Sequence, residues 1–215
     1  MKTPKILIAV PCMDSVAAQF SQALAMLEKE GQCLVSFVIG SLIYNSRNDL
    51  AKQAMKFECD FILWLDSDMV FPPETLKHLL KRINESGADL ISGLYFRRVA
   101  PFTPVAYDKL EIKDGKAAWS DYTGPLTGLQ EVAGVGFGCV LMKTDMLLEM
   151  AAQYGDFFGP IYNVGEDLAF CWRARQLGYK IILDTDLKLG HVGHTVFTQQ
   201  YYEALREDKP NESKS

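Results

Sequence analysis

The sequence contains no hydrophobic run long enough to cross a membrane, and this absence sets a first limit on the class of protein. A transmembrane helix needs about 20 consecutive apolar residues, whereas the N-terminal apolar run at residues 6–10 ends at Pro11. The same run is too short for the apolar core of a secretory signal peptide. We therefore expect no transmembrane segment and a cytoplasmic protein, at most peripheral to a membrane.

Paired cysteines and an excess of positive charge are also missing. The five cysteines are an odd number without a C-x-x-C pair, and most lie in apolar surroundings where a free thiol packs as a small hydrophobic group. This pattern indicates a reducing compartment. The formal net charge of −5 argues against a protein that grips nucleic acid through a basic face.

What is present is the composition of one ordinary folded domain. Of the 215 residues, 48% are hydrophobic and 23% are charged, which is enough for a sizeable core within the usual range of roughly 100–200 residues per domain. We predict a single domain over residues 1–205. The polar tail that follows, residues 206–215, is expected to be disordered.

Apolar runs alternate with helical patterns through the first hundred residues, which predicts an α/β fold. Continuous apolar strands are typical of a parallel sheet covered by helices, with a ligand site at the carboxyl ends of the strands. Residues 102–127 are instead rich in turn formers and short strand fragments. The predicted strands are 6–10, 33–39, 61–65, 88–92, 139–142 and 180–184, and the predicted helices are 15–29, 48–57, 72–87, 144–154 and 166–177.

Asp66-Ser67-Asp68 carries the strongest chemical signal, because it directly follows the apolar strand at 61–65. Two carboxylates at the carboxyl edge of a sheet can share Mg²⁺ or Mn²⁺, which prefer oxygen ligands and keep positions open for substrate phosphates. A polar turn that caps the next helix is the alternative. Acids placed after a buried run are costly unless a cation compensates them, and this favours a metal site.

Two further segments carry candidate catalytic or metal-binding side chains. Glu166 and Asp167 stand at the start of a predicted helix, where acids are often simply caps. At the edge of a flexible pocket, however, one of them could take a proton from a hydroxyl group. His191 and His194 lie in a glycine-flanked segment after the last predicted strand, from which one imidazole could complete the coordination begun by Asp68.

Arg47 precedes the helix predicted at 48–57, and two interpretations of it stay open. If Ser46 or Asn48 caps that helix, Arg47 is free to reach a phosphate. Alternatively, Arg47 pairs on the surface with Asp49 or Glu58. His78, inside another predicted helix, is assigned to structure.

As a set, these motifs resemble the GT-A glycosyltransferases, especially their family-2-like group. The resemblance covers about residues 5–198 and includes a proline-containing loop at 10–14, Arg47-Asn48 before a helix, the D-x-D and Gly165-Glu166-Asp167. It implies one domain with a Rossmann-like mixed, mostly parallel sheet flanked by helices. Residues 1–100 would form the nucleotide-sugar-binding half and residues 101–205 the acceptor and catalytic half.

The resemblance also implies a reaction, in which a sugar passes from a nucleotide-diphosphate donor to a hydroxyl acceptor with Mn²⁺ or Mg²⁺ bound. It places the cation on Asp68 with His191 as a further ligand, or His194 as the alternate, and puts Asp66 at the metal site on the side of the ribose. Asp167 would be the base of an inverting reaction, with Glu166 as helper or acceptor ligand. The residues implied in donor binding are Pro11, Met13, Asp14, Arg47 and Asp66.

Two other functions fit part of the sequence. Residues 66–70 match the D-x-D-x-[TV] motif of haloacid-dehalogenase-like phosphohydrolases, in which Asp66 would be the nucleophile. That family opens with this motif on its first strand, whereas two predicted strands and two predicted helices come first here. A non-catalytic sugar-nucleotide-binding module is the second alternative, although both Asp68 and Asp167 are retained. The acceptor stays open among a saccharide, a protein, a lipid-linked molecule and a modified nucleic acid.

Overall fold

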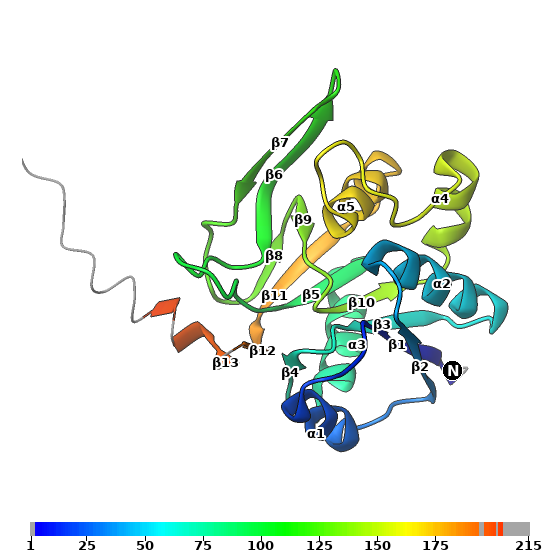
Figure 1. Ribbon diagram of the computed structural model, residues 1–215, viewed down its shortest axis with the longest axis vertical. Coiled ribbons are helices and arrows are strands. Elements are labelled where there is room, and N and C mark those ends of the chain that lie inside the picture. Colours follow the sequence, from blue (N-terminus) through cyan, green and yellow to red (C-terminus); the bar gives the residue numbers. More distant parts are fainter. Residues whose placement is uncertain (1–2, 194–195, 201, 204–215) are drawn as a thin grey trace, which may run out of the picture.

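The computed structural model describes residues 3–193, 196–200 and 202–203 (Figure 1). The predicted tail at 206–215 lies outside these residues. The helices are α1 (Ala18–Met26), α2 (Ile43–Lys56), α3 (Thr75–Ser86), α4 (Met146–Tyr154) and α5 (Glu166–Gln176). Within the described part of the chain, none of them has the length and apolar character that crossing a bilayer requires.

A seven-stranded sheet forms the centre of the molecule. Its strands in spatial order are β2 (Gln32–Ile39), β1 (Lys5–Cys12), β3 (Phe61–Leu65), β10 (Cys139–Lys143), β5 (Leu90–Leu94), β11 (Ile181–Lys188) and β8 (Leu129–Glu131). The neighbours β2, β1 and β3 are parallel, as are β5 and β11, whereas β10 runs antiparallel to both β3 and β5. Strand β8 also runs antiparallel to its neighbour β11. Five of the seven strands thus share one direction, so the sheet is mixed and mostly parallel, as the family resemblance implied.

Both faces of this sheet are buried, because its central strands carry apolar residues on both sides. One hydrophobic cluster packs α2, α4 and α5 against one face, with Leu50, Leu147 and Phe170 among its members. A second cluster packs α1 and α3 against the other face through residues such as Phe20 and Leu79. Because helices cover both faces of the sheet, a ligand site is expected at the ends of the strands.

Residues 102–127 depart from the prediction of short strand fragments. Strands β6 (Ala106–Lys113) and β7 (Lys116–Asp121) form a hairpin that projects from the body of the molecule (Figure 1). Asp114 and Gly115 make its two-residue turn with φ angles of 51° and 75°, the left-handed geometry that matches the twist of paired strands. The Asp-Gly dipeptide is the feature of the sequence from which this hairpin could have been predicted. Strand β9 (Gly134–Val135) pairs with β6.

Helix α2 begins at Ile43 rather than at Asn48, so Ser46 and Asn48 lie inside the helix and the prediction that one of them caps it is wrong. Gly40, with a φ of 74°, ends β2 and turns the chain into the helix. The Asn48 side chain has a different use, because its Oδ1 accepts hydrogen bonds from the backbone N–H groups of Phe157 and Phe158 at 3.3 and 3.0 Å. It thereby ties α2 to the loop before α5.

The segment around His191, expected to be a loop, is strand β12 (Gly190–Val192). It forms a small sheet with β13 (Val196–Phe197) and with β4 (Met69–Val70), the short strand that follows Asp68. The pairing sets His191 opposite Met69. It therefore carries His191 next to the D-x-D turn although more than a hundred residues separate them.

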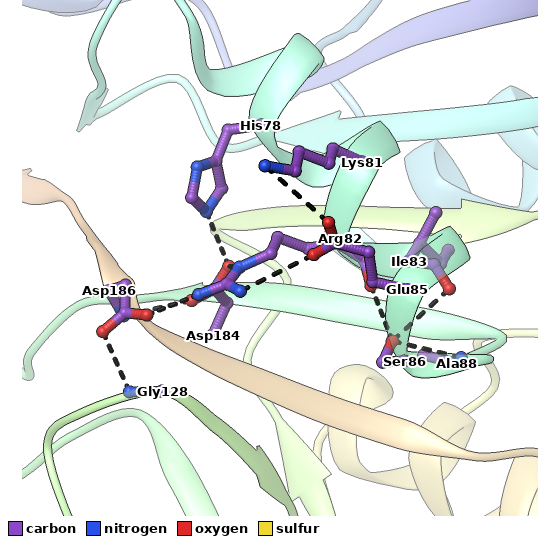
Figure 2. Close-up of polar contacts among 10 residues, drawn as sticks. All are labelled: His78, Lys81, Arg82, Ile83, Glu85, Ser86, Ala88, Gly128, Asp184 and Asp186. Atoms are coloured by element: carbon purple, nitrogen blue, oxygen red, sulfur yellow. Dashed lines mark hydrogen bonds and ion pairs between the residues drawn. The ribbon is translucent and has the colours of Figure 1, made fainter.

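His78 has a structural role, as expected, and Figure 2 shows the cluster around it. Its Nε2 lies 2.7 Å from Oδ2 of Asp184, a fully buried residue of β11. Arg82 pairs with the same oxygen at 3.2 Å and also with Asp186. The backbone N–H of Gly128 donates to the other Asp186 oxygen at 2.9 Å. The cluster fastens α3 to β11 and to the loop that leads into β8.

We predict that Asp184→Asn lowers the free energy of unfolding by about 3 kcal/mol, because it removes the charge of a buried, doubly paired carboxylate. Chemical denaturation measures this change. Asp49→Asn is the matched control, since Asp49 pairs with Lys52 on the surface at 3.7 Å with 57% of its side chain exposed. The control is expected to change stability by less than about 0.5 kcal/mol. Equal effects of both substitutions would contradict this account of the cluster.

Candidate active site

A pocket of about 320 Å³ lies at the carboxyl ends of β1 and β3. The predicted residues Pro11, Met13, Asp66, Asp68 and His191 line it together. Its other lining residues are Cys12, Ser41, Ile43, Ser46, Ser67 and Arg98. The predicted residue Asp14 does not line the pocket. It follows the lining residue Met13 in the chain, it is exposed, and its carboxylate accepts a hydrogen bond from Ser15 Oγ at 3.1 Å.

Asp68 and His191 meet in this pocket, with 3.5 Å between Asp68 Oδ2 and His191 Nε2. His191 Nδ1 lies 2.9 Å from the carbonyl oxygen of Phe96. Since a carbonyl oxygen only accepts, Nδ1 carries a proton, and in the neutral ring the lone pair of Nε2 then faces the carboxylate. Two hydrogen-bond acceptors that face one another repel unless a proton or a metal cation lies between them. A histidine oriented through its other ring nitrogen is the usual form of a metal ligand. His194 lies outside the described residues.

The residues present fit a divalent cation that substrate phosphates would help to hold. Among the residues that the structure describes, no group of three or more His, Cys, Asp or Glu could hold a metal by itself. Mg²⁺ and Mn²⁺, however, are commonly held by one or two protein ligands together with phosphate oxygens. Asp68 and His191 supply one oxygen and one nitrogen, whereas Asp66 already commits its Oδ1 to Arg47 at 2.9 Å.

Opposing influences set the pKa of Asp68. Partial burial acts to raise it, but the interaction with His191 and the positive charge of Arg98 outweigh burial and leave the pKa below its usual value. Arg98 Nη1 lies 2.8 Å from the same Oδ2 that faces His191. The carboxylate therefore stays charged, as a cation ligand must.

Arg47 links the D-x-D to the acidic start of α5. Its side chain is only 2% exposed, and its Nη2 and Nε contact Asp66 Oδ1 at 2.9 Å and Glu166 Oε1 at 3.3 Å. The guanidinium lies 5.3 to 6.0 Å from the ring centroids of Phe137, Trp64 and Phe158, close enough for cation–π attraction. Arg47 is therefore buried and paired with Asp66 and Glu166, so the interpretation that it pairs with Asp49 or Glu58 at the surface is wrong. Its role in donor binding stays a prediction.

Two buried polar atoms beside this cluster have no hydrogen-bond partner within the described ranges, namely Arg47 Nη1 and Ser46 Oγ. Ser46 is 1% exposed and lines the pocket. An unsatisfied buried polar group costs about 1–3 kcal/mol, so a ligand in this pocket that forms a hydrogen bond with the Ser46 hydroxyl would gain affinity from it. In the sequence, the position of Ser46 indicated only a helix cap, and no local signal pointed to a buried hydroxyl without a partner.

The surroundings of Asp167 raise its pKa toward neutral pH, which suits a proton acceptor. Burial, and then the negative charge of Glu166, raise its pKa to about 6, although the backbone N–H of Leu168 donates to its Oδ1 at 2.7 Å. A carboxylate with a pKa close to the working pH is suited to general base catalysis. Burial also raises the pKa of Asp66, although Arg47 opposes it.

Glycines at 136 and 138 allow Tyr95 to approach the base of the site. A Cβ atom on Gly136 would lie 2.2 Å from the Tyr95 hydroxyl, and one on Gly138 would lie 2.8 Å from its ring. The Gly138 N–H donates to the Tyr95 hydroxyl at 3.1 Å, and its carbonyl accepts from the Asp66 N–H at 2.9 Å. The glycine-rich segment therefore holds the D-x-D turn in place through its backbone.

Comparisons with known proteins agree with this fold. The family model described as "Glycosyl transferase family 2" matches residues 43–151, just over half of the chain. The solved structure titled "Crystal Structure of A197 from STIV" superposes with a TM-score of 0.66 at 18% sequence identity, covering 91% of this chain and 94% of that one. At this identity the likeness shows a shared fold alone. No curated protein sequence matches the chain.

We predict that Asp167→Asn becomes more stable relative to the wild type as the pH rises. The folded-state pKa of about 6 lies above the value of about 3.9 for an unfolded chain. Between these values the folded state binds more protons, so Asp167 favours folding at low pH and this contribution is lost as the pH rises. The amide does not titrate.

Urea denaturation of both proteins at about pH 4 and about pH 7 checks this prediction. Asp49→Asn serves as the control for removing a carboxylate at the surface, where 57% of the Asp49 side chain is exposed. A stability difference for Asp167→Asn that is the same at both pH values would show that the carboxyl is not perturbed.

Proposed function

The chain belongs to glycosyl transferase family 2 and is a glycosyltransferase with the GT-A fold, and from this premise we propose a donor, a cofactor and a mechanism. The donor is a nucleotide-diphosphate sugar, the cofactor is Mn²⁺ or Mg²⁺, and the acceptor carries a hydroxyl group. The observation that carries the proposal is the meeting of Asp68 and His191 at 3.5 Å in the pocket at the sheet edge. Because the chain belongs to a glycosyltransferase family, we set aside the hypothesis that Asp66 is the nucleophile of a phosphohydrolase.

The pocket is chemically divided, and this division supports a direction for the donor. The lining residues from the end of β1 and the start of α2, including Pro11, Met13 and Ser46, are neutral, and we call them the neutral side. Asp68, His191 and Arg98 come from other segments, and we call them the charged side. We assign the base and ribose to the neutral side with Asp14 at its edge, where the Ser46 hydroxyl would gain its missing hydrogen bond. The diphosphate belongs to the charged side.

In this arrangement Asp66 would reach the ribose with the oxygen that Arg47 does not hold, and could also approach the cation. Arg47 then contributes to donor binding mainly by fixing Asp66. Asp68 and His191 would hold the cation. When bound, a divalent cation neutralises the charge that develops on the departing diphosphate.

Asp167 acts as the base in the proposed reaction. The acceptor oxygen attacks the anomeric carbon, the bond from this carbon to the diphosphate oxygen breaks with its electron pair, and the hydroxyl proton passes to Asp167. A single displacement of this kind inverts the anomeric centre. Glu166, held by Arg47 at 3.3 Å, helps to orient Asp167 or the acceptor. The pKa of about 6 leaves Asp167 largely unprotonated at neutral pH.

The acceptor is a saccharide, a protein, a lipid-linked molecule or a modified nucleic acid, and the chemistry above is the same for each. Residues 1–100 would serve the donor and residues 101–205 the acceptor. All five cysteines are free thiols, which supports the proposal of a cytoplasmic location.

We predict that Mn²⁺ together with a matching UDP- or GDP-linked sugar stabilises the protein, by about 2.7 kcal/mol at a concentration of about 100 times Kd. Thermal unfolding with each partner alone and with both partners together measures this stabilisation.

Asp68→Asn and His191→Ala are expected to weaken Mn²⁺ binding at least about tenfold, whereas the surface variant Asp49→Asn is expected to bind Mn²⁺ as the wild type does. Unchanged Mn²⁺ affinity in Asp68→Asn would refute the cation site. Stabilisation without release of nucleoside diphosphate would instead identify a binding module.

We further predict that Asp167→Asn lowers kcat by about 100- to 10,000-fold, because the amide cannot accept the acceptor proton. The Kd of the donor is expected to change little. Release of nucleoside diphosphate measures kcat, and the wild-type rate should rise with pH through about pH 6, following Asp167. Glu166→Gln serves as the comparison, with a smaller loss. An Asp167→Asn enzyme that keeps the wild-type kcat would exclude Asp167 as the base.

A further inference from the structure

Arg98 brings a positive charge to the pocket that the proposed mechanism does not use. It follows β5 in the chain, and 44% of its side chain is exposed. Its Nη1 lies 2.8 Å from Asp68 Oδ2 and donates to the carbonyl oxygen of Val192 at 2.9 Å. Arg98 thus joins the D-x-D turn to β12, next to His191. No motif in the sequence marks Arg98.

Arg98 and a divalent cation would compete for Asp68. The guanidinium contacts the same carboxylate oxygen that faces His191 Nε2, so a cation between Asp68 and His191 would lie beside a like charge. Charges at such short distances repel strongly in a partly desolvated pocket. An exposed arginine can turn away at little cost, because surface ion pairs are weak and the side chain is long.

The pocket offers Arg98 another partner once it leaves Asp68, because the charged side of the pocket is where the donor's diphosphate belongs. A guanidinium matches phosphate oxygens with two parallel N–H donors. When the bond from the sugar to the diphosphate breaks, its electron pair adds negative charge to the leaving phosphate oxygen. A guanidinium at this place stabilises that charge as it forms.

We propose that Arg98 exchanges partners: it neutralises Asp68 in the absence of donor, and it binds the donor's diphosphate once a divalent cation has taken its place on Asp68. This inference rests on the proposed function and deepens it, because it assigns Arg98 as a residue that touches the leaving group. It also implies that the cation and the nucleoside diphosphate bind cooperatively, since each favours the same position of Arg98.

Electron paramagnetic resonance of Mn²⁺ tests the exchange without relying on turnover. Arg98→Ala is expected to bind Mn²⁺ alone about two- to fivefold more tightly than the wild type, because the competing cation is gone. With Mn²⁺ saturating, the same variant should bind UDP or GDP, whichever the wild type binds, about tenfold more weakly by calorimetry. Opposite changes in the two affinities are not expected from structural damage. Arg98→Lys keeps the charge without the paired donors and should lie between.

Arg97→Ala is the matched control, since Arg97 is the neighbouring residue but pairs with Asp121 at 2.8 Å and Tyr107 at 3.1 Å. It should bind both Mn²⁺ and the nucleotide as the wild type does. Unchanged or weaker Mn²⁺ binding by Arg98→Ala, or unchanged nucleotide binding, would overturn the exchange. Asp68→Asn separates the two proposals: if it loses Mn²⁺ while Arg98→Ala equals the wild type, only the exchange fails. If the wild type itself binds no Mn²⁺, both fail.

Discussion

The buried positive charge of Arg47 is the constraint on which the site depends. A guanidinium that is 2% exposed requires opposite charges close by, and Asp66 and Glu166 supply them from positions 19 and 119 residues further along the chain. Trp64, Phe137 and Phe158 form the aromatic surroundings of the charge. The end of β3 and the start of α5 must therefore lie together, which sets the D-x-D beside the acidic pair.

The position of the antiparallel strand β10 brings the second half of the chain to the same site. It enters the sheet between β3 and β5, so the glycine-rich segment before it passes the carboxyl end of β3. There the Gly138 carbonyl accepts from the Asp66 N–H, and the Tyr95 hydroxyl accepts from the Gly138 N–H. The second half of the chain thus completes a site whose first carboxylates come from the first half.

Surroundings rather than residue type give the carboxylates of this site different properties. Asp68 has a lowered pKa because His191 and Arg98 outweigh its burial. Asp167 has a raised pKa because burial and Glu166 act in the same direction. Environments that separate the pKa values of nearby acids are how one site obtains both a permanently charged ligand and a proton acceptor. The proposed division of labour between Asp68 and Asp167 follows from this difference.

Local patterns were enough to predict the strand at Phe61–Leu65, the turn that follows it and the helix that starts at Glu166, because burial patterns and helix starts are encoded in neighbouring residues. No local pattern predicts that Arg47 is buried, that Arg98 reaches Asp68 or that the Ser46 hydroxyl has no partner among the described residues. The pairing of β12 with β4, which brings His191 to Asp68, likewise follows only from the folded chain. The physical reason is that these contacts depend on strand order and helix packing, which join distant segments and leave no periodic trace in the chain.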